Sequence, residues 1–207
     1  MAIPEETAGP YPGDGSNGPD VLSQSGIVRS DIRSSFGEFS GIAEGVPMTI
    51  RLTILHASNA CSPVAGAAVY LWHCDRDGQY SLYTITDENY LRGVQEAGSD
   101  GVVTFTSVFP ACYSGRWPHI HFEVYPNLAA AGDDANKIST SQVALPEDAC
   151  NTVFATAGYE QSVQNLQQVS LASDNVFGDD GGVRQLGAVT GTVDDGYSVE
   201  LTVPVST

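Results

Sequence analysis

Two histidines one residue apart are the first feature of this sequence that could do chemistry. His119 and His121 lie in the stretch GRWPHIHFEVY, where they alternate with apolar residues such as Ile120 and Phe122. This alternation is typical of a strand with one buried face. Side chains two apart in a strand project from the same face about 6.6 Å apart, so both imidazoles can reach one metal ion at about 2.1 Å. Taken alone, the pair fits a metal site or two polar residues on a solvated face equally well.

Two tyrosines stand close to this pair in the sequence and near the ends of expected strands. Tyr80 follows a DG turn in WHCDRDGQYSLY, and Tyr113 comes six residues before His119 in FPACYSGRWPH. Each tyrosine alone is typical of a packed aromatic ring with its hydroxyl bonded at an edge. A bound cation favours deprotonation, so a phenol with an ordinary pKa of about 10 can bind it as a phenolate. Hard anionic oxygen donors of this kind favour ferric iron over ferrous iron.

Length and charge limit the classes of protein to which the chain could belong. It has 207 residues, 25 acids and 8 bases, giving a formal net charge of −17. The length suits a single β-sandwich or barrel domain. The charge disfavours nucleic acid and anionic membrane partners, because both would be repelled. No apolar run reaches the roughly 18 residues needed to span a bilayer.

The four cysteines favour an oxidised, exported protein. Cys61, Cys74, Cys112 and Cys150 are even in number and contain no C-x-x-C pair. We therefore expect two disulfides rather than free buried thiols, with the connectivity left open. Cys61 and Cys74 would lie at opposite ends of one expected strand, which disfavours a bond between them. The first fifteen residues lack a basic and an apolar leader segment, so we expect a secreted protein whose signal has been removed.

Strand-like patterns recur along the chain between Gly- and Pro-rich turns. Short strands at intervals of roughly ten residues favour an antiparallel β-sandwich over parallel βαβ units. Residues 1–25 are expected to form an N-terminal arm or linker, and residues 26–207 a single domain. One helix is expected at 145–158, where Pro and acids precede apolar residues and Gly follows. The expected strands are 48–57, 67–75, 101–109, the histidine stretch, 140–145, 186–193 and 197–205.

In combination, these motifs resemble the intradiol ring-cleavage dioxygenases, non-haem ferric enzymes that open catechols between their two hydroxyls. The likeness is densest in CSPVAGAAVYLWHCDRDGQYSLY and in LRGVQEAGSDGVVTFTSVFPACYSGRWPHIHFEVY. It extends loosely to ETAGPY, IVRSDI and STSQVALP, and it is greatest to the secreted bacterial branch. The resemblance implies an all-β antiparallel sandwich of the intradiol type, with long loops and one or two short helices.

The resemblance also implies a metal centre and a reaction. Tyr80, Tyr113, His119 and His121 would bind one Fe(III). Tyr113 would leave the metal and act as an internal base when a catechol binds, while Tyr80 and His119 would stay in place. The substrates would be catechol-type aromatics and O2, and the products muconate-type diacids.

Further positions match the substrate pocket of the family. Arg116 would be a catalytic residue that stabilises negative charge on the substrate, although an arginine in so acidic a chain also fits a surface ion pair. Gln142 matches a polar residue of the pocket, and Gly9, Pro10 and Tyr11 match an arm that lines it. The chain lacks the helical region through which intracellular members dimerise, so a monomer with an open site and broad catechol specificity is expected.

Two other interpretations stay open on the residues alone. A secreted prealbumin-like or carbohydrate-binding sandwich without catalysis fits PVAGAAVYLW and the following turn, but it leaves the tyrosines and the histidine pair unexplained. A cupin would use H-x-H with a glutamate three or four positions later, whereas Glu123 comes only two positions after His121. His56 and His73 fall outside the ligand pattern, and Tyr83 is expected at most in the pocket wall.

Overall fold

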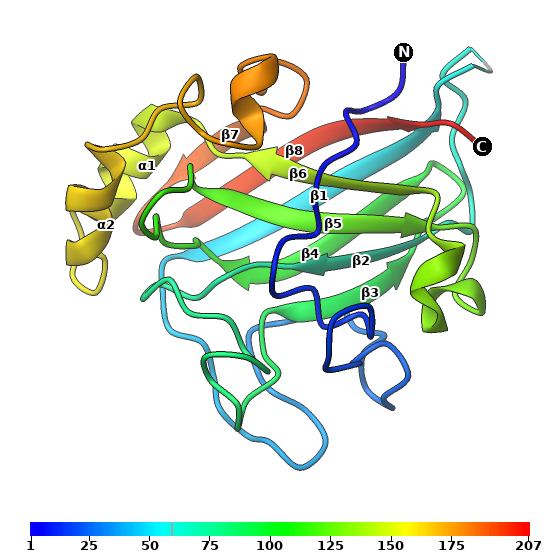
Figure 1. Cartoon of the computed structure of the whole chain (residues 1–207), viewed down its shortest axis with the longest axis horizontal. Helices are drawn as coiled ribbons and strands as arrows, with labels where there is room; N and C mark the ends of the chain where they lie inside the picture. Colours follow the sequence, from blue (N-terminus) through cyan, green and yellow to red (C-terminus); the bar gives the residue numbers. More distant parts are fainter. Residues whose placement is uncertain (59) are drawn as a thin grey trace.

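In the part of the chain that the structure describes, eight strands form two four-stranded sheets that pack face to face (Figure 1). The structure is a computed structural model, and it describes residues 1–58 and 60–207. One sheet has the strand order β4-β1-β8-β7 and the other the order β3-β2-β5-β6. The strands are β1 (Pro47–His56), β2 (Ala68–Trp72), β3 (Arg92–Glu96), β4 (Val102–Val108), β5 (His119–Tyr125), β6 (Ser139–Ala144), β7 (Ala188–Thr192) and β8 (Gly196–Val205).

Alternating side chains fill the space between the sheets. In β1, Met48, Ile50 and Leu52 are buried, whereas the residues between them are partly exposed. They share one core cluster with Ile120 and Phe122 of β5 from the opposite sheet. Because side chains alternate along a strand, the histidines of β5 must face away from this core.

One strand pair departs from the antiparallel pattern expected from the sequence. β8 runs parallel to β1, with Met48 opposite Tyr197, so that sheet is mixed. The β7–β8 hairpin places Gly196 beside Pro47, at the start of β1, and β8 therefore runs in the direction of β1. The expected β-sandwich is confirmed. The expectation that its strands pair antiparallel is corrected for the β1–β8 pair, which is parallel.

Two short helices lie at one end of the sandwich (Figure 1). α1 (Glu147–Phe154) confirms the expected helix in shorter form, with Pro146 and two acids at its start. α2 (Glu160–Leu166) and β3 were not predicted, and in β3 the polar residues and Gly93 conceal the strand pattern. Three 3-10 helices are η1 (Ala130–Gly132), η2 (Asp134–Asn136) and η3 (Phe177–Asp179). Within the described ranges, no helix is long and apolar enough to cross a membrane.

The N-terminal segment lies across the outer face of the β3-β2-β5-β6 sheet (Figure 1). The backbone N–H of Glu6 donates to the carbonyl of Thr140 in β6 at 2.8 Å. Further along, Pro12, Gly13 and Asp14 are buried. The segment therefore covers the face to which the histidines of β5 point.

The expected disulfides are absent, because all four cysteines are free in this structure. Cys61 is exposed, whereas the other three are buried. The Cys74 thiol lies 3.7 Å from the carbonyl of Ala111, and the Cys112 thiol lies 3.4 Å from the carbonyl of Arg116. These two thiols contact backbone carbonyls and form no S–S bond, and burial raises the pKa of Cys112 to about 12.

Candidate metal centre

The strand register places His121 between two neighbours on the outer face of the sheet. Trp72 of β2 is paired with His121 on one side, and Gln142 of β6 on the other. The Trp72 and His121 rings stack with centroids 4.8 Å apart and planes 5° from parallel. The tryptophan therefore fixes the plane of the His121 imidazole.

The outer face is closed from solvent, which excludes the interpretation of two polar residues on a solvated strand. His119 is 2% exposed and His121 3%. Gly9 of the arm lies directly against the ring, because a Cβ at this position would be 3.4 Å from Cε1 of His121. Its φ of +72° also favours glycine.

Four polar side-chain atoms converge at this point. Nε2 of His119 lies 3.1 Å from Nε2 of His121 and 3.2 Å from the Tyr113 hydroxyl. The Tyr80 hydroxyl lies 3.5 Å from Nε2 of His119 and 3.4 Å from the Tyr113 hydroxyl. The structure thus brings together the four ligands that the resemblance implied, from β5 and two loops.

Burial keeps both histidines neutral, and a hydrogen bond also orients the ring of His119. Nδ1–H of His119 donates to the carbonyl of Trp117 at 2.5 Å, which leaves the lone pair of Nε2 directed at the cluster. Burial lowers the pKa of His119 to about 3 and holds the pKa of His121 well below its ordinary range. Both rings are therefore neutral at pH 7.

The tyrosines need a cation to become phenolates. Burial raises the pKa of Tyr113 to about 12, and it raises the pKa of Tyr80 well above its ordinary value. Ligands about 2.1 Å from one ion and at right angles to one another lie roughly 3 Å apart, close to the separations of His119, His121 and Tyr113. Two neutral imidazoles and two phenols therefore fit a hard trivalent cation, which would displace the phenol protons.

Arg116 is held beside this cluster by two partners. Its Nε donates to Asp174 at 2.9 Å, and one terminal nitrogen donates to Oε1 of Gln142 at 2.7 Å. The other terminal nitrogen lies 3.4 Å from Nε2 of His119. Arg116 thus lies beside the cluster, as the pocket interpretation expected. It also forms an ion pair, as the alternative expected, but this pair is partly buried.

Asp174 belongs to the site although no sequence motif predicts it. It lies in the last third of the chain, in no motif, after α2. Its Oδ2 accepts from Arg116 and from the backbone N–H of Trp117, so it joins the C-terminal segment to the loop before β5. A buried acid in an acidic chain gives no local sequence signal.

A cavity of about 590 Å³ adjoins the cluster on the side of its two tyrosines. Gly9, Pro10 and Tyr11 line it, as expected, together with Tyr80 and Tyr113. The Tyr11 ring lies 4.9 Å from the Tyr80 ring. The arm therefore forms one wall of the cavity.

Two expected pocket residues stand behind that wall. Gln142 is fully buried, and its Nε2 donates to the carbonyl of Thr7 at 2.9 Å, so it connects the arm to Arg116. The Tyr83 hydroxyl accepts from the N–H of Gly13 and donates to Asn17. Both residues hold the arm and do not line the cavity.

The remaining histidines and Glu123 are used elsewhere. His73 contacts the Cys74 carbonyl and the Ser107 hydroxyl, each at 2.7 Å, and His56 contacts Thr207. Glu123 binds Lys137 at 3.0 Å and accepts from the Tyr125 hydroxyl at 2.7 Å. Its carboxylate thus faces other partners, and the histidine–glutamate set of a cupin is not formed.

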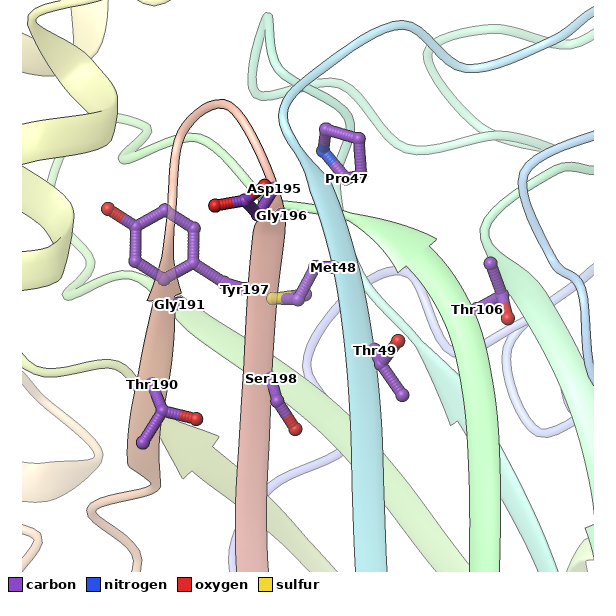
Figure 2. Close-up of a pocket in the computed structure, with 10 residues that line it drawn as sticks. All are labelled: Pro47, Met48, Thr49, Thr106, Thr190, Gly191, Asp195, Gly196, Tyr197 and Ser198. Carbon is purple, nitrogen blue, oxygen red and sulfur yellow. The ribbon is translucent and has the colours of Figure 1, made fainter.

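A second cavity, of about 300 Å³, lies at the β7–β8 hairpin on the other sheet (Figure 2). Thr49, Thr190 and Ser198 give it hydroxyl groups, and Asp195 is its carboxylate. Its lining contains no histidine. In residues 1–58 and 60–207, no group of three or more His, Cys, Asp or Glu side chains is placed to hold a metal ion.

Comparison with known proteins places this arrangement in a known fold. No family model matches the chain. An intradiol ring-cleavage dioxygenase from Tetranychus urticae superposes with a TM-score of 0.78 at 23% identity, over 100% of this chain and 95% of that one. The dioxygenase domain of a carbohydrate-binding fusion protein from Streptomyces sp. SirexAA-E gives 0.64 at 19% identity, over 100% and 99%.

A match among curated proteins is shorter. Chlorocatechol 1,2-dioxygenase of Rhodococcus opacus is 35% identical over 54 residues, which are 25% of this chain and 21% of that protein. The match thus spans about a fifth of that relative's length.

The chain has the fold of the intradiol ring-cleavage dioxygenases. The sandwich of this type expected from the sequence is confirmed. The fold is more similar to the Tetranychus urticae protein than to the Streptomyces domain, although the motifs resemble the bacterial branch.

Proposed function

We propose that this chain is a non-haem Fe(III) intradiol dioxygenase that cleaves catechol-type aromatics with O2 to muconate-type diacids. The observation that carries the proposal is the cluster of Tyr80, Tyr113, His119 and His121 beside a cavity, in which Nε2 of His119 lies 3.1–3.5 Å from the polar atoms of the other three. The shared fold supports it, because the similar structures and the short curated match are dioxygenases by name.

The four donors would hold the metal, and their burial assigns them different roles. Tyr80 is 2% exposed and lies between the Tyr11 and Tyr113 rings, so it is placed to remain a ligand throughout. Tyr113 is only partly buried and lines the cavity, so its oxygen is placed to accept a proton from an entering catechol hydroxyl. When bound, Fe(III) would act as a Lewis acid that draws electron density from a chelated catechol.

Arg116 and the arm would complete the site. The guanidinium is fixed from two sides by Asp174 and Gln142, so its third nitrogen faces the cluster at no further cost in side-chain entropy. The arm covers His121 and limits the access of water. The non-catalytic sandwich module remains the alternative, but it gives no reason to bury four such donors together.

Visible spectroscopy and product analysis test the proposal. Protein loaded with ferric iron should show a broad phenolate-to-iron charge-transfer band that shifts on addition of catechol. It should also convert catechol to a ring-opened diacid that contains both atoms of labelled O2. Tyr80→Phe should weaken and shift the band and should abolish turnover.

Tyr83→Phe is the matched control, because Tyr83 also contacts the arm but lies outside the donor cluster. It should keep the band. A folded protein that stays colourless and inactive with ferric iron would overturn the proposal.

A further inference from the structure

The charge of the cavity is a property that the proposed function leaves open. Among the residues that line it in the described part of the chain, Arg116 alone is charged. The remaining lining groups are aromatic, apolar or neutral and polar, such as Tyr11, Val176, Ser114 and Asn175. A substrate therefore meets a single cationic side chain there.

That cation already has an anionic partner. Asp174 is 2% exposed, and its Oδ2 lies 2.9 Å from Nε of Arg116. Its Oδ1 accepts from the backbone N–H groups of Val176 and Phe177 at 2.8 and 3.0 Å. Burial alone would raise the pKa of Asp174, but these hydrogen bonds and the one from Trp117 hold it below its ordinary value. Asp174 is thus ionised and offsets the charge of Arg116.

A charged substituent on the aromatic ring would therefore be poorly accommodated. An anion buried without a partner cation pays a large desolvation cost. Here the one cationic side chain of the lining is paired with Asp174, and the whole chain carries a formal net charge of −17. An uncharged ring substituent would contact Pro10, Tyr11 and Val176 without this cost.

We propose that the cavity selects uncharged catechols over catechols that carry a carboxylate, and that Asp174 sets this preference through its ion pair with Arg116. This inference rests on the proposed function and specifies the substrate class of the same site. Asp174 acts as a positioning residue, because it touches Arg116 and the loop but does not line the cavity.

The test compares catechol with 3,4-dihydroxybenzoate, both in turnover and in binding to the ferric enzyme followed by the visible band. The unaltered enzyme should favour catechol in kcat/KM by at least about tenfold. Asp174→Asn keeps the shape and an acceptor oxygen but removes the charge. It should lower the KM for 3,4-dihydroxybenzoate more than the KM for catechol, and so reduce the preference.

Two further variants keep the test decisive. Asp194→Asn removes one charge from the exposed β7–β8 turn and should leave the preference unchanged. Ser114→Lys adds a cation at an exposed position in the cavity wall, and it should reduce the preference even if Asp174→Asn fails to fold.

The inference is overturned if the coloured enzyme uses both compounds equally well, or if neither Asp174→Asn nor Ser114→Lys changes the ratio. A protein that binds no iron and turns over neither compound contradicts the proposed function itself. The two failures are therefore distinguishable.

Discussion

At the scale of single residues, the candidate centre consists of two histidines from one strand and two tyrosines from loops, whose polar atoms meet at Nε2 of His119. His119 and His121 could be assigned to one face from their spacing, and the tyrosines followed from the motifs around them. Neither spacing nor motif could reveal Asp174, because its contact with Arg116 joins positions 58 residues apart. Long-range polar contacts of this kind depend on chain topology, which local patterns do not encode.

Arg116 can be tested at this scale without disturbing the donors. Arg116→Lys keeps the charge but loses the fork that binds Asp174 and Gln142 together. We expect catechol turnover to fall about a hundredfold while the visible band remains. Steady-state kinetics on iron-loaded protein measures this effect. Arg33→Lys, at an exposed pair with Asp31, is the control and should have normal turnover.

At the scale of elements, the site depends on how strands and loops are joined. Arg92 of β3 is 1% exposed, and all its N–H groups donate to neutral acceptors. These are the carbonyls of Tyr11 and Pro12 in the arm, the hydroxyl of Tyr70, and the hydroxyl and carbonyl of Ser81, next to Tyr80. β3 was missed in the sequence, so this connection could not be predicted.

Arg92→Met should destabilise the protein by about 3 kcal/mol or more, because it leaves several buried acceptors without donors. Urea unfolding monitored by circular dichroism measures the loss. Arg51→Met is the matched control, since Arg51 is a strand arginine with an exposed side chain 3.9 Å from Glu200. A loss for Arg92→Met no larger than that of Arg51→Met would show that the arm is held by other contacts.

His73 joins the two sheets, because it follows β2 and accepts from Ser107 of β4. Burial lowers the pKa of His73 to about 4 from its ordinary 6.5. The unfolded chain therefore takes up the proton first as the medium is acidified. The contribution of neutral His73 to the free energy of unfolding is complete above pH 6.5. Roughly 3 kcal/mol of that free energy is lost as the pH falls from 6.5 to 4.

His73→Gln should therefore flatten the dependence of the unfolding free energy on pH between 7 and 4 in iron-free protein. His56→Gln, at an exposed position, should leave that dependence unchanged. An identical slope in the unaltered protein and in His73→Gln would contradict the buried neutral state of His73.

At the scale of the whole molecule, the strand pattern predicted the sandwich. It did not predict the direction in which the last strand, β8, runs beside β1. Alternation in β1 and β5 fixes which faces are buried. The parallel pairing of β1 with β8 places the last strand beside the first, and nothing local in the sequence indicates that direction. The structure does not show the expected disulfides, and cysteine count and composition say nothing about where each thiol points.

The expected monomer remains a prediction. Light scattering coupled to size exclusion should give a mass near the chain mass of 21.8 kDa at all accessible concentrations. A mass that rises with concentration towards twice this value would indicate a dimer.

The central claim is that two phenol oxygens and two imidazole nitrogens bind one ferric ion. Crystals of protein loaded with ferric iron, measured on both sides of the iron absorption edge, test it most directly. We expect one strong anomalous peak among the side-chain tips of Tyr80, Tyr113, His119 and His121. A peak elsewhere, or none in protein that retains its fold, would contradict it.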